Sequence, residues 1–313
     1  MNAFDPAALD CLLALADTGS FDRAALQLAI TQSAVSQRLR TLETGLGRLL
    51  VVRSRPLRLT EPGKLLLRHA RQMQALRADI AHELGTALAQ DERLPIAVNA
   101  DSLATWVLPA LNELVQAGQR EGHGVELIVD DQDFTHDRLR EGEVLGCVST
   151  IAEALRGCSA TPLGCMRYIA AASPTFIERA MPQGLNRANF AKLPWLVFNR
   201  KDDMAATWAG KAFGLREPRL VPRSIPSTEA HARAAVLGWG IGVLPEQMAA
   251  PWLARGELQA IHPEVCVDVQ LHWHQWKLHA DDMPEPRLRA GRLDRIGRAL
   301  ADGARRQLRP APG

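Results

Sequence analysis

The spacing of apolar residues near the N-terminus predicts three short helices in succession. The first covers residues 6–16, with Asp5 as its cap and Pro6 at its first position. Two more helices follow, joined by a tight turn, and their candidate N-caps are Ser20 and Thr31. Their apolar residues recur on one face of each helix, at Phe21, Ala24, Ala25 and Leu28 and then at Val35, Leu39 and Leu42. Such a pair matches a helix-turn-helix.

The opposite face of the third predicted helix is polar. It carries short hydrogen-bonding side chains and one cation, at Gln32, Ser33, Ser36, Gln37 and Arg40. Side chains of these kinds suit base edges and phosphates in a major groove. Taken alone, the stretch equally fits an ordinary helical hairpin with a polar face. We expect Gln32, Ser36 and Gln37 to contact bases if the helix enters DNA.

The residues that follow decide between these alternatives. Two short apolar runs, 49–52 and 57–59, bracket a basic tip that contains Arg53 and Arg55, and they predict a β-hairpin, or wing. From residue 38 to residue 71 the cations far outnumber the two acids, in a chain whose formal charge is only +2. A local basic excess of this kind is typical of phosphate binding. The N-terminal region is therefore predicted to bind DNA, with Arg53 and Arg55 on phosphates.

A long helix is predicted from the turn at 60–63 to about residue 89. Apolar residues recur in it every seven positions, at Leu66, Met73, Ile80 and Ala87, flanked by His69, Leu76 and Leu84. A seven-residue repeat indicates a seam between two helices. The stripe could instead pack on its own domain, but little neighbouring apolar sequence is available to accept it. We therefore expect a dimer seam.

The remaining two thirds of the chain alternate between strand and helix patterns, which predicts two α/β lobes. First-lobe strands are expected near 94–98, 125–129 and 144–148, with helices at 103–116 and 137–141. Second-lobe strands are expected near 168–172, 195–198, 220–225 and 241–244. A strand at 267–273 returns to the first lobe, and a helix follows at about 286–301. Two lobes joined by crossing strands make a cleft, as in solute-binding proteins.

The predicted strand ends carry polar residues that suit a small zwitterion. Ser102 and the amides that begin the next helix suit a carboxylate. Asp130, Asp131 and Asp133 follow the next strand, and several carboxylates in one loop are costly unless a cation joins them. Lysine and arginine offer both groups, although solvated turn acids would give the same pattern. The further candidates for ligand contacts are Thr135, Ser149, Asn199, Asp202, Ser227 and Thr228.

Composition excludes several classes of protein. Apolar and charged fractions of 47% and 23% are those of a soluble globular protein. No run approaches the roughly 20 apolar residues of a membrane span, and no signal peptide is visible. The five cysteines are scattered, which favours reduced thiols in the cytoplasm.

Motifs for catalysis or metal binding are weak. His272 and His274 could pair on one strand face, but no third ligand is close in sequence. No nucleophile, phosphate-loop or dinucleotide motif stands in a suitable context. We predict no catalytic residue, no metal and no cofactor.

Several motifs together resemble those of the LysR-type transcriptional regulators. These are the helix-turn-helix near residue 20, the wing RSRPLRLTEPG and the long helix from Pro62. Further motifs resemble the subgroup that controls basic amino-acid export in response to lysine or arginine, namely NADSLATWVLP (99–109), VDDQDFTHDRL (129–139), GEVLGCVST (142–150), FNRKDD (198–203) and IPSTEAHARAAVLGWGIGVLP (225–245). Phe134 stands where that subgroup's pattern has a histidine.

The resemblance implies an α/β protein with three parts: a winged helix-turn-helix at 1–60, a linker and dimerisation helix at 61–90, and an effector-binding domain of periplasmic-binding-protein type at 91–313. Lobe I of that domain would comprise about 91–160 and 267–303, and lobe II about 161–266. The implied partners are promoter DNA, lysine or arginine, RNA polymerase, and further copies of the chain in a dimer or tetramer. The alternative is an architectural DNA-binding protein without an effector, and an enzyme is a more remote third possibility.

Overall fold

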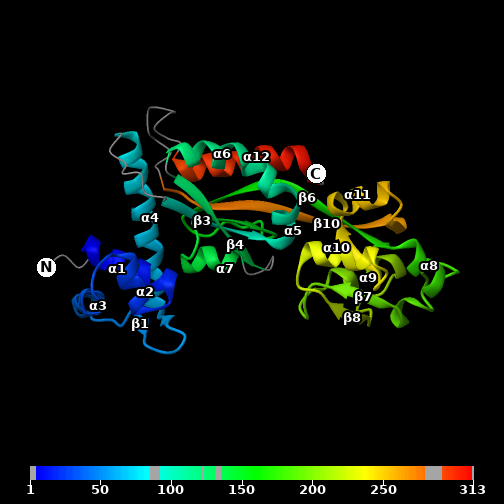
Figure 1. Cartoon of the computed structure of the whole chain (residues 1–313), viewed down its shortest axis with the longest axis horizontal. Helices are drawn as coiled ribbons and strands as arrows, with labels where there is room; N and C mark the ends of the chain where they lie inside the picture. The colour runs from blue at the N-terminus through cyan, green and yellow to red at the C-terminus, as the bar shows by residue number, and fades with distance from the viewer. Residues whose placement is uncertain (1–4, 85–91, 122, 131–134, 279–290, 312–313) are drawn as a thin grey trace.

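The N-terminal part of the computed structural model is a three-helix head with a small hairpin (Figure 1). The model describes residues 5–84, 92–121, 123–130, 135–278 and 291–311. The helices are α1 (Pro6–Thr18), α2 (Phe21–Gln27) and α3 (Gln32–Leu46). Strands β1 (Val51–Val52) and β2 (Arg58–Leu59) pair antiparallel as the predicted wing. The apolar faces of all three helices meet in one core that includes Leu9, Leu12, Val35 and Leu39.

The helix caps agree only in part with the expected ones. The hydroxyl of Thr31 accepts a hydrogen bond from the amide of Ala34 at 3.2 Å, which makes Thr31 the N-cap of α3. Ser20 has the extended backbone of a cap, but its side chain, like that of Asp5, makes no capping hydrogen bond. The turn between α2 and α3 is closed by Ala29, whose φ of +51° lies in the left-handed region.

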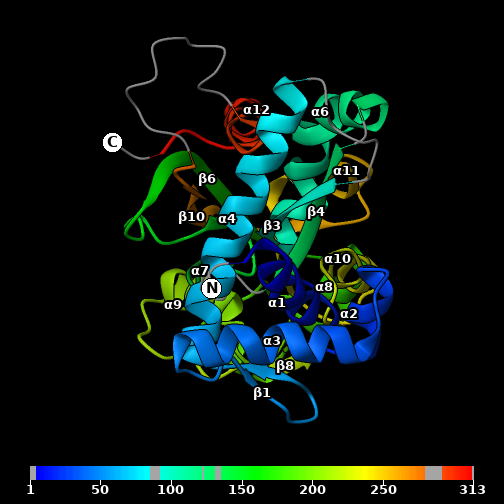
Figure 2. The same ribbon diagram turned by 90° about the vertical axis from the view of Figure 1, so that its left-hand side faces the viewer.

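Helix α4 (Glu61–Glu83) leaves the head and runs across the face of the next domain (Figure 2). Its first turns complete the core of the head, where Leu66, Leu67 and Ala70 are buried. This corrects part of the predicted seam, because Leu66 packs inside its own protomer instead of facing a second helix. Further along, Met73 is 42% exposed, Ile80 49% and Leu84 70%. Ala87 lies outside the described residues.

A six-stranded sheet runs through the rest of the molecule in the order β4-β3-β5-β10-β6-β9. Strands β3 (Glu92–Asn99), β4 (His123–Asp130) and β5 (Gly146–Ser149) are parallel to one another. The long strands β6 (Cys158–Ala172) and β10 (Gln259–Trp276) pair along most of their length and cross from one lobe to the other (Figure 1). Strand β10 also pairs with β5, so the predicted return to the first lobe is observed, along a strand longer than expected.

Helices cover both faces of the first lobe. On one face lie α6 (Leu108–Glu121) and α12 (Arg292–Gln307), and on the other lies α7 (Thr135–Glu141) (Figure 1). The predicted helix at 103–116 begins instead with α5 (Ala100–Ser102) and a π-helical turn (Leu103–Val107). The last helix starts at Arg292 and ends at Gln307, later than the expected 286–301, and residues 286–290 lie outside the described part.

The second lobe is built from shorter elements around strand β7 (Pro194–Val197), which pairs with β8 (Val221–Ser224), while Trp195 bridges to Ile241 just before β9 (Gly242–Pro245). Its core holds the buried indoles of Trp195 and Trp208. Around these strands lie α8 (Pro174–Ala180), a 3₁₀ turn (Phe190–Lys192), α9 (Met204–Phe213), α10 (Thr228–Val236) and α11 (Glu246–Ala254).

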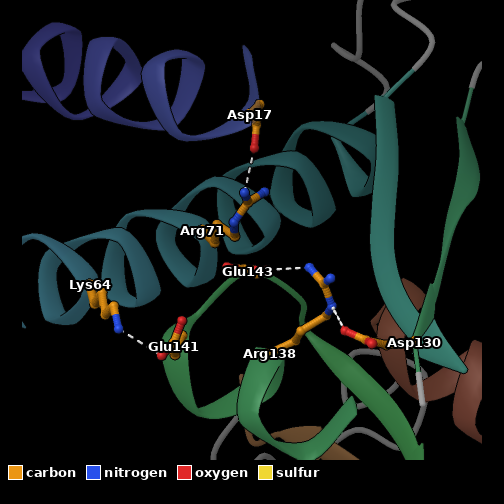
Figure 3. A network of polar contacts seen from close by, with 7 residues as sticks. All are labelled: Asp17, Lys64, Arg71, Asp130, Arg138, Glu141 and Glu143. Atoms are coloured by element: carbon orange, nitrogen blue, oxygen red, sulfur yellow. Dashed lines mark hydrogen bonds and ion pairs between the residues drawn. The ribbon is translucent and has the colours of Figure 1, made fainter. Parts of the chain in front are cut away.

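Salt bridges hold α4 against both the first lobe and the head (Figure 3). Lys64 pairs with Glu141 at the end of α7 at 2.6 Å, and Arg71 pairs back to Asp17 in the head. Gly142, directly after α7, has a φ of +78°, and a Cβ there would lie 2.5 Å from Cα of Arg68. This close approach requires glycine, so the end of α7 and helix α4 pack backbone to backbone.

Two further predictions concern thiols and membranes. The five cysteines are free, and all except Cys266 are buried. Among the described residues, no helix combines the length and the hydropathy that a membrane crossing requires.

Candidate ligand cleft and nucleic-acid interface

A cavity of about 310 Å³ lies between the lobes, at the carboxyl ends of β3 and β4. In open α/β sheets, ligands bind at this edge. Both lobes and the crossing strands contribute to its walls, which are formed by Asn99, Ala100, Asp101, Asp130, Tyr168, Phe198, Asn199, Lys201, Asp202, Asp203, Met204, Thr228, His231, Val243, Leu244 and Pro245.

The charged residues of this lining are mostly acidic. Its carboxylates are Asp101, Asp130, Asp202 and Asp203, and Lys201 is a cation on the same wall. Asp130 is neutralised from outside the cavity, because its Oδ2 accepts a hydrogen bond from Nε of Arg138 at 2.6 Å (Figure 3). The cavity therefore carries an excess of negative charge that favours a cationic ligand.

Asp202 organises its own loop while it faces the cavity. Its Oδ2 accepts from the amide of Phe198 at 2.6 Å, and its Oδ1 accepts from the amide of Met204 at 2.9 Å. Oδ1 of Asn199 accepts from the amide of Lys201 at 2.7 Å. These bonds fix the loop before α9 and hold the Asp202 carboxylate at the cavity wall.

Asp101 connects the two lobes. Its Oδ2 accepts from the hydroxyl of Tyr168 on β6 at 2.7 Å, and its Oδ1 accepts from the hydroxyl of Thr228 on α10 at 2.8 Å. Burial raises the pKa of Asp101, the two hydrogen bonds lower it, and the nearby charge of Asp202 raises it again. The net shift in pKa is upward, as expected for a carboxylate whose charge has no cation beside it.

Two buried polar side chains of the lining have unused hydrogen-bonding atoms. Asn99 is 3% exposed, and neither its Oδ1 nor its Nδ2 has a partner within the described structure. His231 is 6% exposed, and its Nε2 is likewise unpartnered there. Burial lowers the pKa of His231 to about 4, although the charge of Asp202 opposes the shift. Unsatisfied polar atoms in a cavity wall indicate a place where a ligand completes the hydrogen bonding.

The predicted ligand contacts are distributed unevenly around this cavity. Asn199 and Asp202 line it, as does Thr228, whereas Asp131 and Asp133 lie outside the described residues. Four predicted residues are absent from the lining, namely Ser102, Thr135, Ser149 and Ser227.

Three of those four hydroxyl residues form hydrogen bonds with backbone groups instead. Thr135 donates to the carbonyl of Val148 at 2.8 Å. Ser149 accepts from the amide of Ile151, and Ser227 accepts from the amide of Ala230 as the N-cap of α10. Ser102 is fully buried, and its hydroxyl has no partner within the described residues.

Sequence reasoning missed most of the lining, including four polar residues that could bind a ligand: Asn99, Asp101, Tyr168 and His231. Asn99 and Asp101 stand beside Ser102, but nothing in the local sequence ranked them above it. Tyr168 lies in a segment that the sequence predicts only as a strand of the second lobe. His231 could have been found from Thr228, because residues three apart share one face of a helix.

The exposed face of α3 carries the predicted DNA contacts. Gln32, Ser33, Gln37 and Arg40 are exposed, and Ser36 is half-buried. Arg53 reaches back from the wing, where its Nη2 donates to Oγ of Ser36 at 3.1 Å and its guanidinium lies 5.0 Å from the ring centroid of Phe21. Arg53 thus joins the wing to the exposed face of α3.

His272 and His274 do share a strand face, and both are buried. His136 joins them from α7, with ring centroids 5.1 Å from His274. Burial lowers the pKa of all three rings, so they are neutral near pH 7. Within the described part of the chain, no group of three or more His, Cys, Asp or Glu residues could hold a metal ion.

Comparison with known proteins assigns the family. Residues 6–64 match the family described as bacterial regulatory helix-turn-helix protein, lysR family, and residues 89–290 match the LysR substrate binding domain. The chain belongs to the LysR family. It is 39% identical over 313 residues to the HTH-type transcriptional regulator ArgP of Aeromonas salmonicida, which covers 99% of this chain and 100% of the relative.

The LysG regulator of Corynebacterium glutamicum is similar to this chain in both sequence and structure. The lysine export transcriptional regulatory protein LysG is 38% identical over 307 residues, covering 98% of this chain and 100% of the relative. Full-length LysG with bound effector Arg superposes with a TM-score of 0.71 at 37% identity, covering 98% and 100% of the two chains.

These matches confirm the predicted family and fold class, a LysR helix-turn-helix followed by a substrate-binding domain of mixed α/β structure. The relatives are transcriptional regulators, and no family of enzymes is indicated.

Proposed function

We propose that this LysR-family protein is a sequence-specific transcriptional regulator whose effector is lysine or arginine, and that it controls a gene for an amino-acid exporter. The observation that carries the proposal is the cleft between the lobes, which combines an acidic lining with buried, unpartnered polar side chains. The names of the relatives support it, since one regulates lysine export and its structure holds Arg as effector.

The charge of the cleft favours a basic amino acid over a neutral one. The ligand's side-chain cation would offset the acidic lining, and its carboxylate would meet hydrogen-bond donors. We assign the ligand contacts to Asn199 and Asp202, which line the cavity, and keep Asp131 and Asp133 as contacts proposed from the sequence alone. Ser102 is buried outside the lining, so we no longer assign it a direct contact. Thr135, Ser149 and Ser227 then act by fixing the backbone of the loops that carry these contacts.

On the head, the exposed face of α3 would enter the major groove. Gln32, Ser36 and Gln37 would contact base edges there, with Ser33 and Arg40 beside them. Arg53 and Arg55 on the wing would contact phosphates. The contact between Arg53 and Ser36 supports this division, because it holds the wing against the reading helix before DNA is bound.

Assembly would follow from helix α4. The exposed stripe of Met73, Ile80 and Leu84 suits a second copy of the same helix, which gives a dimer. We expect two dimers to form a tetramer that contacts RNA polymerase at promoters in the cytoplasm. The working division of the chain is a DNA-binding head at 1–60, a linker at 61–90 and an effector domain at 91–313.

An architectural DNA-binding protein without an effector is the alternative. Its cleft would be filled with apolar side chains, whereas this cleft is polar and carries opposed donors and carboxylates. We also propose that the cleft binds its ligand without catalysing a reaction.

DNA selection tests the proposal. Duplexes that bind the full chain would be selected from a random pool, and affinity would then be measured by fluorescence anisotropy with and without lysine or arginine. We expect one enriched sequence, and a change in its affinity or in the size of its complex when the effector is added. If no sequence is enriched, the proposal of a sequence-specific regulator is refuted. If neither amino acid changes the affinity or the size of the complex, the proposal of lysine or arginine as effector is refuted.

Variants of the head sharpen this experiment. Ser36→Ala and Gln37→Ala should lower the ratio of specific to non-specific affinity, whereas Arg53→Ala should weaken both and flatten the salt dependence by roughly one counterion. Arg255→Ala, exposed on the second lobe, removes the same charge far from the head as the control. Equal ratios in all four variants would contradict the assignment of α3 as the reading helix.

A further inference from the structure

Asp101 lies where the two lobes meet across the cleft. It belongs to the short α5 turn at the end of β3, in the first lobe. Thr228, which donates to one of its oxygens, is the first residue of α10 in the second lobe, and Tyr168 on the crossing strand β6 donates to the other. The carboxylate is therefore held in a fixed orientation from two sides.

The donors that hold Asp101 are neutral hydroxyls, so they do not balance the negative charge of its ionised form. Among the described residues, the groups that act on its pKa include Asp202, another acid, and no cation. Burying a charge is costly unless an opposite charge accompanies it. A carboxylate that is oriented, partly buried and without a cation at a cavity wall is suited to receive one from a ligand.

Donors for an anion lie beside this carboxylate. Asn99 precedes Asp101 by two residues, and its buried side-chain amide is unpartnered within the described structure. His231 stands one helical turn after Thr228, and its Nε2 is unpartnered there too. Residues three apart lie on one face of a helix, so His231 shares the face from which Thr228 reaches Asp101.

An α-amino acid presents a cation and an anion on neighbouring atoms, which matches this pairing of an acid with flanking donors. We propose that Asp101 selects α-amino acids by pairing its carboxylate with the α-ammonium group of the effector, while Asn99 and His231 receive the α-carboxylate. This assignment rests on the proposed amino-acid effector and leaves the other acids of the lining to the effector's side chain. Because Thr228 holds the same carboxylate, the bound ammonium also lies at the junction of the two lobes.

Lysine and 6-aminohexanoate test the assignment, because the second compound is lysine without its α-ammonium group. Both would be titrated by calorimetry into the full-length wild type and into Asp101→Asn, which has nearly the same shape. The control is Glu229→Gln, which removes one negative charge from an exposed position on α10. Circular dichroism and thermal unfolding would establish that each variant is folded.

The wild type and the control should bind lysine at least tenfold more tightly than 6-aminohexanoate. Asp101→Asn should weaken lysine binding roughly ten- to a hundredfold and leave 6-aminohexanoate almost unchanged, since only lysine has the group that Asp101 contacts. Equal losses for both compounds, or no loss for lysine, would overturn the assignment.

The wild type alone supplies a test that does not depend on a folded variant. If it binds 6-aminohexanoate as tightly as lysine, the α-ammonium group is not read and the inference is wrong. If it binds neither lysine nor arginine, the proposed effector itself fails, and the inference fails with it. If the wild type binds lysine and Asp101→Asn binds it with the same affinity, the role of Asp101 is refuted while the proposed effector stands.

Discussion

The contact between Asp79 and Arg292 offers a quantitative test of how the linker helix is held. Nε of Arg292 donates to Oδ1 of Asp79 at 2.8 Å, and the two side chains are only 7% and 6% exposed. The same Oδ1 lies 3.5 Å from the amide of Arg292, which begins α12. Asp79 on α4 thus both neutralises a buried guanidinium and caps the last helix of the effector domain.

Removing one partner should be far more costly than removing both. Asp79→Leu breaks a buried ion pair by removing one of its partners, which typically costs about 3–5 kcal/mol. Asp79→Leu combined with Arg292→Met replaces the pair by apolar side chains and should recover most of that loss. The exposed pair Arg140–Asp137 is the control, and Arg140→Ala should cost less than about 1 kcal/mol.

Hydrogen exchange over residues 72–83 measures the docking of α4 directly. We expect the single variant to lose about a hundredfold or more in amide protection, the double variant to regain most of it, and the control to match the wild type. A double-mutant cycle gives the coupling between the two side chains. If Asp79→Leu and Arg292→Met each keep wild-type protection, or if their separate losses simply add in the double variant, the pair does not hold the helix.

Three further predictions concern the seam, the turn and the cleft. Ile80→Asp would place a carboxylate in the exposed stripe of α4, so light scattering should show a smaller assembly, and an unchanged size would put the seam elsewhere. Ala29→Gly relieves a left-handed backbone and should raise stability by up to about 1 kcal/mol; a lower melting temperature would contradict this. The pKa of His231 is lowered to about 4, so between pH 6.5 and 4 the unfolded protein binds a proton that the folded protein does not. The contribution of this residue to stability is therefore complete above pH 6.5 and is lost as the pH falls toward 4. His231→Gln should therefore flatten the fall in stability over that range by up to about 3 kcal/mol, and an unchanged slope would refute it.

The elements of the head could be predicted from sequence because each has a local cause. The apolar stripe of α3 and the cap at Thr31 depend on residues within one or two helical turns, and both occur as expected. Which residues of α4 belong to the seam was harder to predict. Leu66 packs in the same core as Leu50, and no local pattern in the sequence specifies that the two come together. The same limit applies to the long strand β10, whose length is set by pairing with β6.

The cleft shows where local reasoning stops. Asn199 and Asp202 follow a strand end, so their place on the cavity wall could be inferred from alternation alone. Asp101 could not be ranked, because its role depends on Tyr168 and Thr228, which lie 67 and 127 residues away in the chain. Ser102 looked the better candidate, yet it is fully buried and does not line the cavity.

Calorimetric titration of the full-length protein with lysine, arginine and norleucine tests the central claim most directly. Norleucine keeps the α-amino and carboxyl groups and nearly the length of lysine, but lacks the side-chain cation. We predict saturable binding of lysine or arginine, with at least tenfold weaker binding of norleucine, because the lining of the cleft is acidic. Binding of norleucine as tight as that of the basic amino acids, or no binding of either basic amino acid, would contradict the account.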